Sequence, residues 1–338
     1  MESISLALGS RQDISIKDLL KLAKEADGLG YTGCFVGESW GMDAFTTLSA
    51  IASCTKNICV GTGIVPIFSR TPSLLAQSIA SLDIISGGRA ILGLGTSGRR
   101  VIENWHGMKY ERPIERSKEY LEIIRIALNN SLVNYDGNFF QTNRFKLAIS
   151  PVQKNIPLYL ASIGPSNLRL TGQLADGWLP IWTDLQKLPE LIGQISDSAK
   201  SAGRNISDIT ISPQIMCCVT NTTKELYKAQ NDVREHMSYY IGGMGEYYHD
   251  LFCRFGYQLE ANSIKNAWMS GNRKMAASLV TNQMLDNITV IGDPESCRSK
   301  IERFRQMGAD MPVIAFHHRA TPDSIMNTIR ALAPVDTN

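Results

Sequence analysis

The sequence lacks the features that mark several large classes of protein. It has no apolar run near the roughly 20 residues that span a bilayer. It also has no Cys-x-x-Cys pair and no His/Cys/acid cluster at metal-ligand spacing, so we expect no metal site. Its seven cysteines are scattered among apolar residues, as in reduced cytoplasmic proteins. The N-terminus has no basic start followed by a long apolar core, which argues against a signal peptide. We therefore expect a soluble, cytoplasmic protein.

An excess of charge of one sign is also missing. The chain has 34 Lys and Arg against 32 Asp and Glu, a net charge of +2. Binding to nucleic acid or to an anionic membrane normally needs a basic patch or stripe, and only short basic pairs such as Arg99-Arg100 are present. No G-x-S-x-G elbow and no phosphate-loop lysine motif occurs, which argues against serine hydrolases and P-loop NTPases. The expected partner is a small molecule, with no nucleic acid and no membrane.

Short apolar runs alternate with amphipathic segments along most of the 338 residues. The predicted strands cover residues 4–8, 33–36, 58–64, 90–94, 157–161, 177–181, 209–219 and 312–316. Eight strands alternating with helices favour a (β/α)8 TIM barrel over a doubly wound sheet, which usually has five to seven strands. We therefore expect an α/β fold with a single domain over residues 1–338.

Two segments interrupt the alternation and predict insertions into the barrel. Asp136-Gly137 lies between aromatic residues and indicates a hairpin after strand four, at roughly 130–150. A helical segment rich in Met and Tyr, at roughly 220–285, follows strand seven. The helical segment could cover the mouth of the barrel or form a subunit interface.

In a barrel of this kind the active site lies at the C-terminal ends of the strands. Few acids, several glycines and several aromatic residues lie at these ends, which suits a planar ligand that carries a phosphate. Residues 93–98 match G-x-G-x-x-G. A dinucleotide fold would place a second strand about 20 residues later, but residues 115–120 lie inside a strongly helical stretch, which argues against that fold. Their backbone N–H groups could hold a phosphate, or the segment could be a plain turn. Ser166 could cap a helix whose N-terminus binds an anion, or the segment could be an ordinary capped junction.

Two side chains are candidates for moving a proton. Glu38 is the one acid placed at a predicted strand end, where it could contact a ring or transfer a proton, or could pair with a nearby arginine. His106 follows strand four and is either a proton donor or a polar lining residue. The same alternatives apply to His317 and His318 at the end of strand eight.

The run Leu82–Gly95, which reads LDIISGGRAILGLG, resembles a signature of the bacterial-luciferase-like oxidoreductases. Residues 156–165, 174–180 and 290–295 continue the resemblance in order along the chain. Residues 38–45, 104–107 and 240–245 are similar to the branch that uses the deazaflavin coenzyme F420, which includes methylenetetrahydromethanopterin reductase. The resemblance implies a (β/α)8 barrel, a homodimer or homotetramer, and hydride transfer between C5 of the deazaflavin and a small organic substrate.

The resemblance also implies positions for the cofactor and the substrate. A bulge with a non-proline cis peptide at Gly63-Ile64 would lie under the ring, and Glu38 would contact the ring. Trp40, Trp105 and Trp182 would wall the substrate pocket, and Glu38 or His106 would handle the proton. Contacts to the tail and its phosphate would come from two loops: Gly95, Thr96, Ser97 and Gly98, and Ser162, Ile163, Gly164, Pro165, Ser166 and Asn167.

Two other functions stay open: an FMN-dependent luciferase-like monooxygenase, and a non-catalytic flavin- or deazaflavin-binding protein. Three departures from the branch prevent a choice of substrate. Ser39 stands where its sugar-phosphate dehydrogenases carry a histidine, and Thr96 and Ser97 stand where they carry an acid. The first predicted strand, residues 4–8, lacks the acid found in methylenetetrahydromethanopterin reductase.

Overall fold

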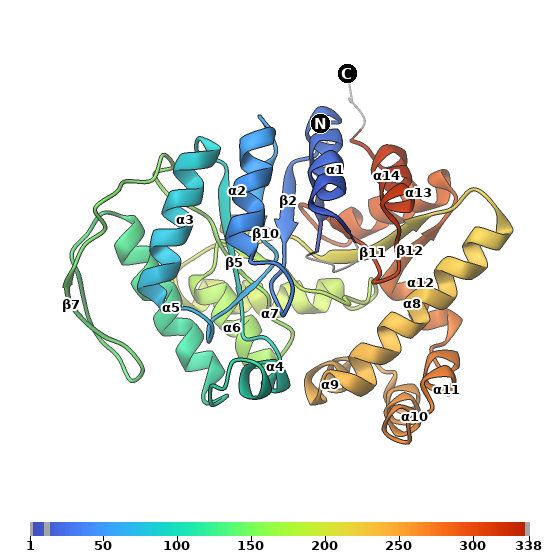
Figure 1. Cartoon of the computed structure of the whole chain (residues 1–338). Helices are drawn as coiled ribbons and strands as arrows, with labels where there is room; N and C mark the ends of the chain where they lie inside the picture. Colours follow the sequence, from blue (N-terminus) through green and yellow to red (C-terminus); the bar gives the residue numbers. More distant parts are fainter. Residues whose placement is uncertain (1–2, 10–13, 335–338) are drawn as a thin grey trace.

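The computed structural model of the chain describes residues 3–9 and 14–334. Helices lie around the outside of a curled, mostly parallel sheet, and a further group of helices lies to one side of it (Figure 1). The strands are β1 Ser5–Ala7, β2 Gly33–Val36, β3 Cys59–Thr62, β4 Val65–Pro66, β5 Ala90–Gly95, β6 Val133–Asp136, β7 Gln141–Phe145, β8 Leu158–Leu160, β9 Gly177–Trp178, β10 Thr210–Ile211, β11 Gln214–Val219, β12 Thr289–Gly292 and β13 Val313–Ala315.

The helices on the outside of the sheet begin with good capping residues or with proline. Asp43 caps α2 and Thr71 caps α3, and each side chain accepts a backbone N–H of the first turn. The helices are α1 Ile16–Gly28, α2 Ala44–Cys54, α3 Pro72–Ser86, α4 Arg99–Asn104, α5 Pro113–Leu128, α6 Pro165–Leu174, α7 Leu188–Ser201, α8 Thr223–Gly243, α9 Glu246–Arg254, α10 Gln258–Met269, α11 Arg273–Ser278, α12 Asn282–Ile288, α13 Pro294–Gln306 and α14 Pro322–Ala331. In the described part of the chain, no helix has both the length and the apolar character to cross a lipid bilayer.

The order of the strands shows how far the sheet curls. Hydrogen-bonded neighbours run β10-β9-β8-β5-β3-β2-β1-β13-β11-β12, and β4 pairs with β5. Only Ser212 and Pro213 separate β10 from β11 in the chain, and Ile181 bridges Gln214 of β11. The sheet therefore curls far enough to bring the end that carries β9 and β10 beside β11. The expected α/β class is confirmed at this level.

The inner side of the curl is filled by large side chains. Phe35 of β2 and Tyr159 of β8 are buried there, with ring centroids 6.3 Å apart. An ideal Cβ on Gly61 would lie 2.6 Å from the Phe35 ring, so a glycine is required on β3 at this point. A separate apolar core, which includes Met237, Phe252 and further residues of α8 to α12, stabilises the helical group.

Three differences from the predicted elements have physical causes. The strand predicted at 209–219 is divided into β10 and β11, because Pro213 has no N–H to donate to a neighbouring strand. β12 was not predicted; it is a four-residue strand that pairs only with the end of β11. The short helix α4 was not predicted. The hairpin β6–β7 and the helices α8 to α12 fall in the two segments that interrupt the alternation.

Candidate active site

The loops that follow β2, β3 and β5 meet at one end of the sheet. The backbone N–H of Glu38 donates to the carbonyl of Ile64 (2.9 Å), and the N–H of Ile67 donates to the carbonyl of Gly95 (3.0 Å). An ideal Cβ on Gly95 would lie 2.9 Å from Cδ1 of Ile64. The structure therefore brings together Glu38, Ile64 and Gly95, three of the predicted site residues. We call this place, at the C-terminal ends of β2, β3, β5 and β8, the rim.

The peptide between Gly63 and Ile64 is trans. No cis peptide bond occurs in residues 3–9 and 14–334, so the expected cis peptide is wrong for this structure. The close approach of the backbone is nevertheless present. The N–H of Gly63 donates to the carbonyl of Val36 (2.8 Å), and an ideal Cβ on Gly63 would lie 3.0 Å from the backbone nitrogen of Gly37. Glycine at position 63 thus lets two rim loops touch.

The carboxylate of Glu38 is held by Arg70. Its Oε1 lies 2.5 Å from Nη1 of Arg70, and its Oε2 accepts hydrogen bonds from Nη2 of Arg70 (2.9 Å) and from the N–H of Ala44 (3.0 Å). Arg70 also pairs with Asp43, the cap of α2. The hydrogen bond to Glu38 raises the pKa of Arg70 above its usual range. Of the two alternatives for Glu38, the structure supports pairing with an arginine of the rim.

His106 follows α4 and is half-buried. Its Nε2 is buried, and no hydrogen-bond partner for it is found among the described residues. Buried polar atoms in folded proteins almost always have a hydrogen-bond partner, so we expect this nitrogen to bind either water or a ligand. Of the two predicted proton donors, His106 is the one with an uncommitted polar atom.

The first turn of α6 is a helix N-terminus without a side-chain cap. The N-cap is Gly164, which has no side chain to accept a hydrogen bond, so the expectation that Ser166 caps this helix is wrong. Ser166 instead accepts a hydrogen bond from Nη2 of Arg169 (3.0 Å). Asn167 is 8% exposed, and its Oδ1 is buried with no partner among the described residues. A polar ligand could complete both the helix end and the amide.

Other predicted tail contacts differ in how accessible they are. The hydroxyl of Ser162 is buried against Thr171 Oγ1 (2.8 Å), and the carbonyl of Ile163 accepts a hydrogen bond from Nη2 of Arg254 on α9 (3.0 Å). These two residues therefore support the loop from within. Thr96 and Ser97 are half-buried, and Ser97 has a left-handed backbone with φ of 56°.

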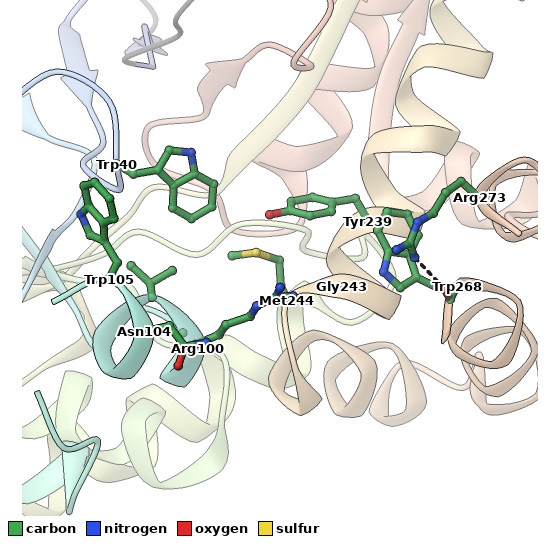
Figure 2. Close-up of a pocket in the computed structure, with 11 residues that line it drawn as sticks. Trp40, Arg100, Asn104, Trp105, Tyr239, Gly243, Met244, Trp268 and Arg273 are labelled. Carbon is green, nitrogen blue, oxygen red and sulfur yellow. Dashed lines mark hydrogen bonds between the residues drawn. The ribbon is translucent and has the colours of Figure 1, made fainter. Parts of the chain in front are cut away.

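Beside the rim lies a cleft of about 510 Å³ between two walls (Figure 2). Trp40 and Trp105 form one wall, and Tyr239 and Met244 face them from the helical group. The helical group therefore covers this side of the rim, which is one of its two expected roles. The full lining is Trp40, Gly98, Arg100, Val101, Asn104, Trp105, Tyr239, Gly243, Met244, Trp268 and Arg273.

Trp182 does not line this cleft. It is 1% exposed and packs edge-on against His236 (5.4 Å between ring centroids) and Tyr240 (5.3 Å). His236 in turn contacts His318, with ring centroids 4.9 Å apart. Trp182 and His318 thus join α8 to the end of β13, whereas Trp40 and Trp105 both line the cleft.

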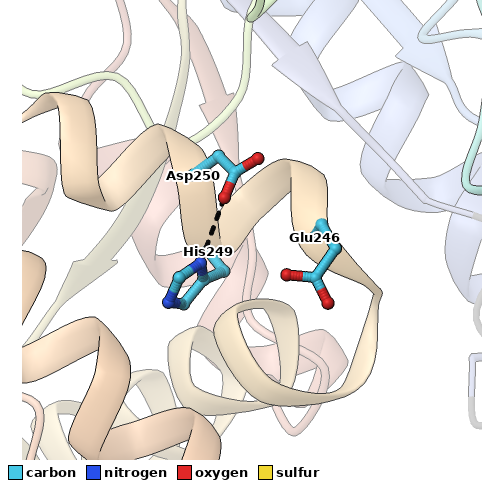
Figure 3. A group of neighbouring side chains, drawn as sticks. All are labelled: Glu246, His249 and Asp250. Atoms are coloured by element: carbon cyan, nitrogen blue, oxygen red, sulfur yellow. Dashed lines mark hydrogen bonds and ion pairs between the residues drawn. The ribbon is translucent and has the colours of Figure 1, made fainter.

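Glu246, His249 and Asp250 of α9 form one group in the described residues that could hold a metal ion (Figure 3). Each of the three already has a partner. Nδ1 of His249 lies 3.1 Å from Asp250 and its Nε2 lies 2.9 Å from Asn262, while Glu246 pairs with Lys265 (2.5 Å). The arrangement serves to join α9 to α10.

Several residues of this region carried no clear signal in the sequence. Arg70 was expected only as an unspecified arginine, and Arg100 was noted only as part of a basic pair. Trp268 and Arg273 lie more than 160 residues after Arg100 in the chain, and only the fold places them at the same cleft. A pattern of neighbouring residues cannot reveal such a contact.

Comparison with known proteins decides the family. Residues 3–311 match the family model described as luciferase-like monooxygenase. The chain belongs to this family. The resemblance found in the sequence is therefore confirmed.

Relatives and solved structures agree with this assignment. A Mycobacterium tuberculosis protein, provisionally named a coenzyme F420-dependent oxidoreductase, is 28% identical over 87% of this chain and 89% of its own. The 5,10-methylenetetrahydromethanopterin reductase of Methanolobus tindarius is 28% identical over 85% of this chain and 86% of its own. The coenzyme F420-dependent tetrahydromethanopterin reductase of Methanopyrus kandleri has the same fold, with a TM-score of 0.83 at 24% identity over 98% of both chains.

Proposed function

We propose that this luciferase-like protein is an F420-dependent oxidoreductase that transfers a hydride between C5 of the deazaflavin and a small organic substrate. The observation that carries the proposal is the first turn of α6, which has no side-chain cap and holds the buried, unpartnered Oδ1 of Asn167. It lies in the loop after β8, where the family resemblance implies contacts to the tail of the cofactor. Three relatives by sequence have names that state coenzyme F420, whereas two solved structures of the same fold, at 13% and 19% identity, name FMN.

The residues present fit such a cofactor. The ring would lie against Gly63 and Ile64, and the tail would extend over two loops at the rim. Backbone N–H groups and the dipole of α6 compensate a phosphate locally, so the small net charge of +2 is no obstacle. The tail contacts that we propose are Gly95, Thr96, Ser97, Gly98, Gly164, Pro165, Ser166 and Asn167, while Ser162 and Ile163 hold the second loop in place from within.

F420, when bound, supplies or accepts the hydride. The chain provides position, shielding and a proton. Trp40, Trp105 and Tyr239 would exclude water once a substrate fills the cleft, and Nε2 of His106 holds the proton that accompanies the hydride. Glu38 accepts hydrogen bonds from Arg70 and from the N–H of Ala44, which keeps Arg70 and the start of α2 in place, so we assign it a positioning role at the ring.

We further propose the finer architecture and assembly. The curled sheet is a (β/α)8 barrel formed by one domain over residues 1–338. The hairpin at roughly 130–150 is an insertion after the fourth barrel strand, and the helices at roughly 220–285 are an insertion after the seventh. The protein works in the cytoplasm as a homodimer or homotetramer. Exposed apolar side chains on one side of α3 support a protein contact there: Leu74, Ile84 and Ile85, at 45%, 43% and 51% exposure.

Titration of the purified protein with F420 and with FMN tests the proposed function. We expect micromolar or tighter binding of F420, much weaker binding of FMN, and oxidation of reduced F420 with some members of a panel of unsaturated ketones and imines. Tight FMN binding without F420 binding would instead support the monooxygenase. Binding of F420 with no hydride transfer to any acceptor, and no effect of replacing His106, would indicate a non-catalytic binding protein.

A further inference from the structure

The cleft beside the rim has an unusual combination of side chains. Three tryptophans and a tyrosine reach it from four separate segments, and no carboxylate lines it. Two of the tryptophans are largely open to solvent, Trp40 at 48% and Trp105 at 64% exposure. Single exposed apolar residues are normal on a protein surface. Several exposed indole rings gathered at one concave surface are instead typical of a binding site.

The two cations of the cleft have no acidic partner. In residues 3–9 and 14–334, Arg100 and Arg273 make no ion pair. The neighbouring Arg99, by contrast, pairs with Glu103 (2.7 Å). Arg273 is held in place without an acid, because its guanidinium stacks 3.6 Å from the centroid of the Trp268 ring and donates to the Trp268 carbonyl (2.6 Å). The planar guanidinium of arginine suits bidentate binding of a carboxylate or phosphate.

The walls of the cleft come from two parts of the molecule, the rim with α4 and the helical group. Arg100 extends along the floor toward Met244, while Arg273 lies at the far end beside Trp268 (Figure 2). Gly98, a proposed contact of the cofactor tail, also lines the cleft, and an ideal Cβ on it would lie 3.7 Å from the Met244 carbonyl. A molecule in the cleft would therefore lie next to the cofactor.

We propose that the cleft binds the organic substrate and that this substrate is a planar anion, a conjugated ring system with a carboxylate or phosphate group. This inference rests on the proposed function. The ring system packs among Trp40, Trp105 and Tyr239, and the anionic group is bound by Arg100 or, in a longer molecule, by Arg273. Arginines and exposed aromatic rings thus select both the shape and the charge of the substrate.

Calorimetric titration of the cofactor-free protein with 2-naphthoate and with 2-naphthylmethanol tests this selection, because the two probes differ only in the charged group. We expect naphthoate to bind at least tenfold more tightly. The double variant Arg100→Gln, Arg273→Gln should lose this preference, and Lys274→Gln, next to Arg273 but outside the cleft, should keep it. Equal affinities in the wild-type protein, or a preference that survives the double variant, would overturn the inference.

The anionic tail of F420 is the other ligand that the arginines could serve. We therefore expect the double variant to bind F420 within twofold of the wild-type affinity. A loss of more than tenfold would assign the arginines to the cofactor tail and overturn the inference, while the proposed function would stand. Selective naphthoate binding by a protein that does not bind F420 would have the opposite meaning, since the cleft would remain and the proposed function would fail. Unchanged thermal melting of the variants controls for folding.

Discussion

Glu38 is held at the rim by three hydrogen bonds, two from Arg70 and one from the N–H of Ala44. In all three bonds the carboxylate oxygens are the acceptors, so the contacts of Glu38 are those of a group that positions its neighbours. The same arginine pairs with Asp43 at the start of α2. The rim loop after β2 is thus tied to α2 and to the loop before α3.

A substitution at Glu38 tests this contact. Glu38→Gln keeps the shape of the side chain but removes the charge opposite Arg70, and we expect the free energy of unfolding to fall by about 1–3 kcal/mol. The pH profile of turnover should keep its form. Urea denaturation and steady-state kinetics measure the two effects. Loss of one limb of the pH profile, with stability unchanged, would instead make Glu38 the proton donor.

For His106 we expect the reverse of the Glu38 result, a loss of turnover with little change in stability. His106→Gln removes a group that can carry a proton near neutral pH, and general acid–base catalysis contributes about 100-fold or more to rate. We expect turnover to fall by about that factor, while the affinity for F420 and the melting temperature change little. Turnover that stays within threefold of wild type would show that another group supplies the proton.

At the scale of elements, Asp27 near the end of α1 anchors the start of β3. Its carboxylate accepts the backbone N–H groups of Lys56 (2.8 Å), Asn57 (2.9 Å) and Ile58 (2.7 Å). Burial alone would raise the pKa of Asp27, but these hydrogen bonds outweigh it and the pKa is lowered. The ionised form is therefore stabilised in the folded chain.

A lowered pKa means that this contribution to stability is present above the unfolded value, about 3.9, and is lost as the pH falls through the folded value. Asp27→Asn should therefore lower the free energy of unfolding by about 1–3 kcal/mol at pH 7, with a difference from wild type that shrinks below pH 4. Denaturation at several pH values measures it. A difference independent of pH would show that the charge is not involved.

Helix contacts beside the cleft give a matched pair of variants. An ideal Cβ on Gly242 of α8 would lie 2.4 Å from Cβ of Trp268 on α10, whereas Gly193 of α7 has nothing within 4 Å. Gly242→Ala should destabilise the protein by about 1–3 kcal/mol through overpacking. Gly193→Ala should stabilise it by about 0.5–1 kcal/mol, since alanine favours a helix. Thermal melts that shift in the same direction for both variants would contradict the packing described between α8 and α10.

Residues 83–89, within the run that carries the family resemblance, stabilise the fold at the end of β5 away from the rim. Asp83 is buried and accepts hydrogen bonds from Gln153, and Gly87 and Gly88 take left-handed conformations at the turn after α3. Arg89 donates to the carbonyls of Ser86 (2.7 Å) and Ala52 (3.0 Å). This run therefore predicts the fold and the family well, and contains little about the substrate.

In the molecule as a whole, local patterns predicted the alternation of strands and helices, while the role of the rim loops in binding a cofactor tail stays a prediction. They could not predict contacts between distant segments. The pairing of Arg70 with Glu38 depends on how two rim loops meet. The burial of Trp182 beneath α8 and the meeting of Trp105 with Trp268 at one cleft depend on how the helical group packs on the sheet. The cleft, and with it the inferred substrate class, belongs to this scale.

Assembly depends on the outer surface of the molecule. We expect a stable homodimer or homotetramer by light scattering at micromolar concentration, because an apolar side of α3 that remained in water would be costly. Ile85→Glu should weaken the assembly if α3 takes part in the contact. A monomer at all concentrations would contradict the proposed assembly and leave the site unaffected.

A crystal structure with bound F420 would show directly whether the cofactor binds at the rim. We expect the deazaflavin ring to lie against Gly63 and Ile64, with the tail phosphate within hydrogen-bond distance of Thr96 to Gly98 or of the first turn of α6. We also expect the Trp40–Trp105 cleft to open beside C5. A cofactor bound elsewhere on the molecule, or a protein that takes up FMN and not F420, would contradict this expectation.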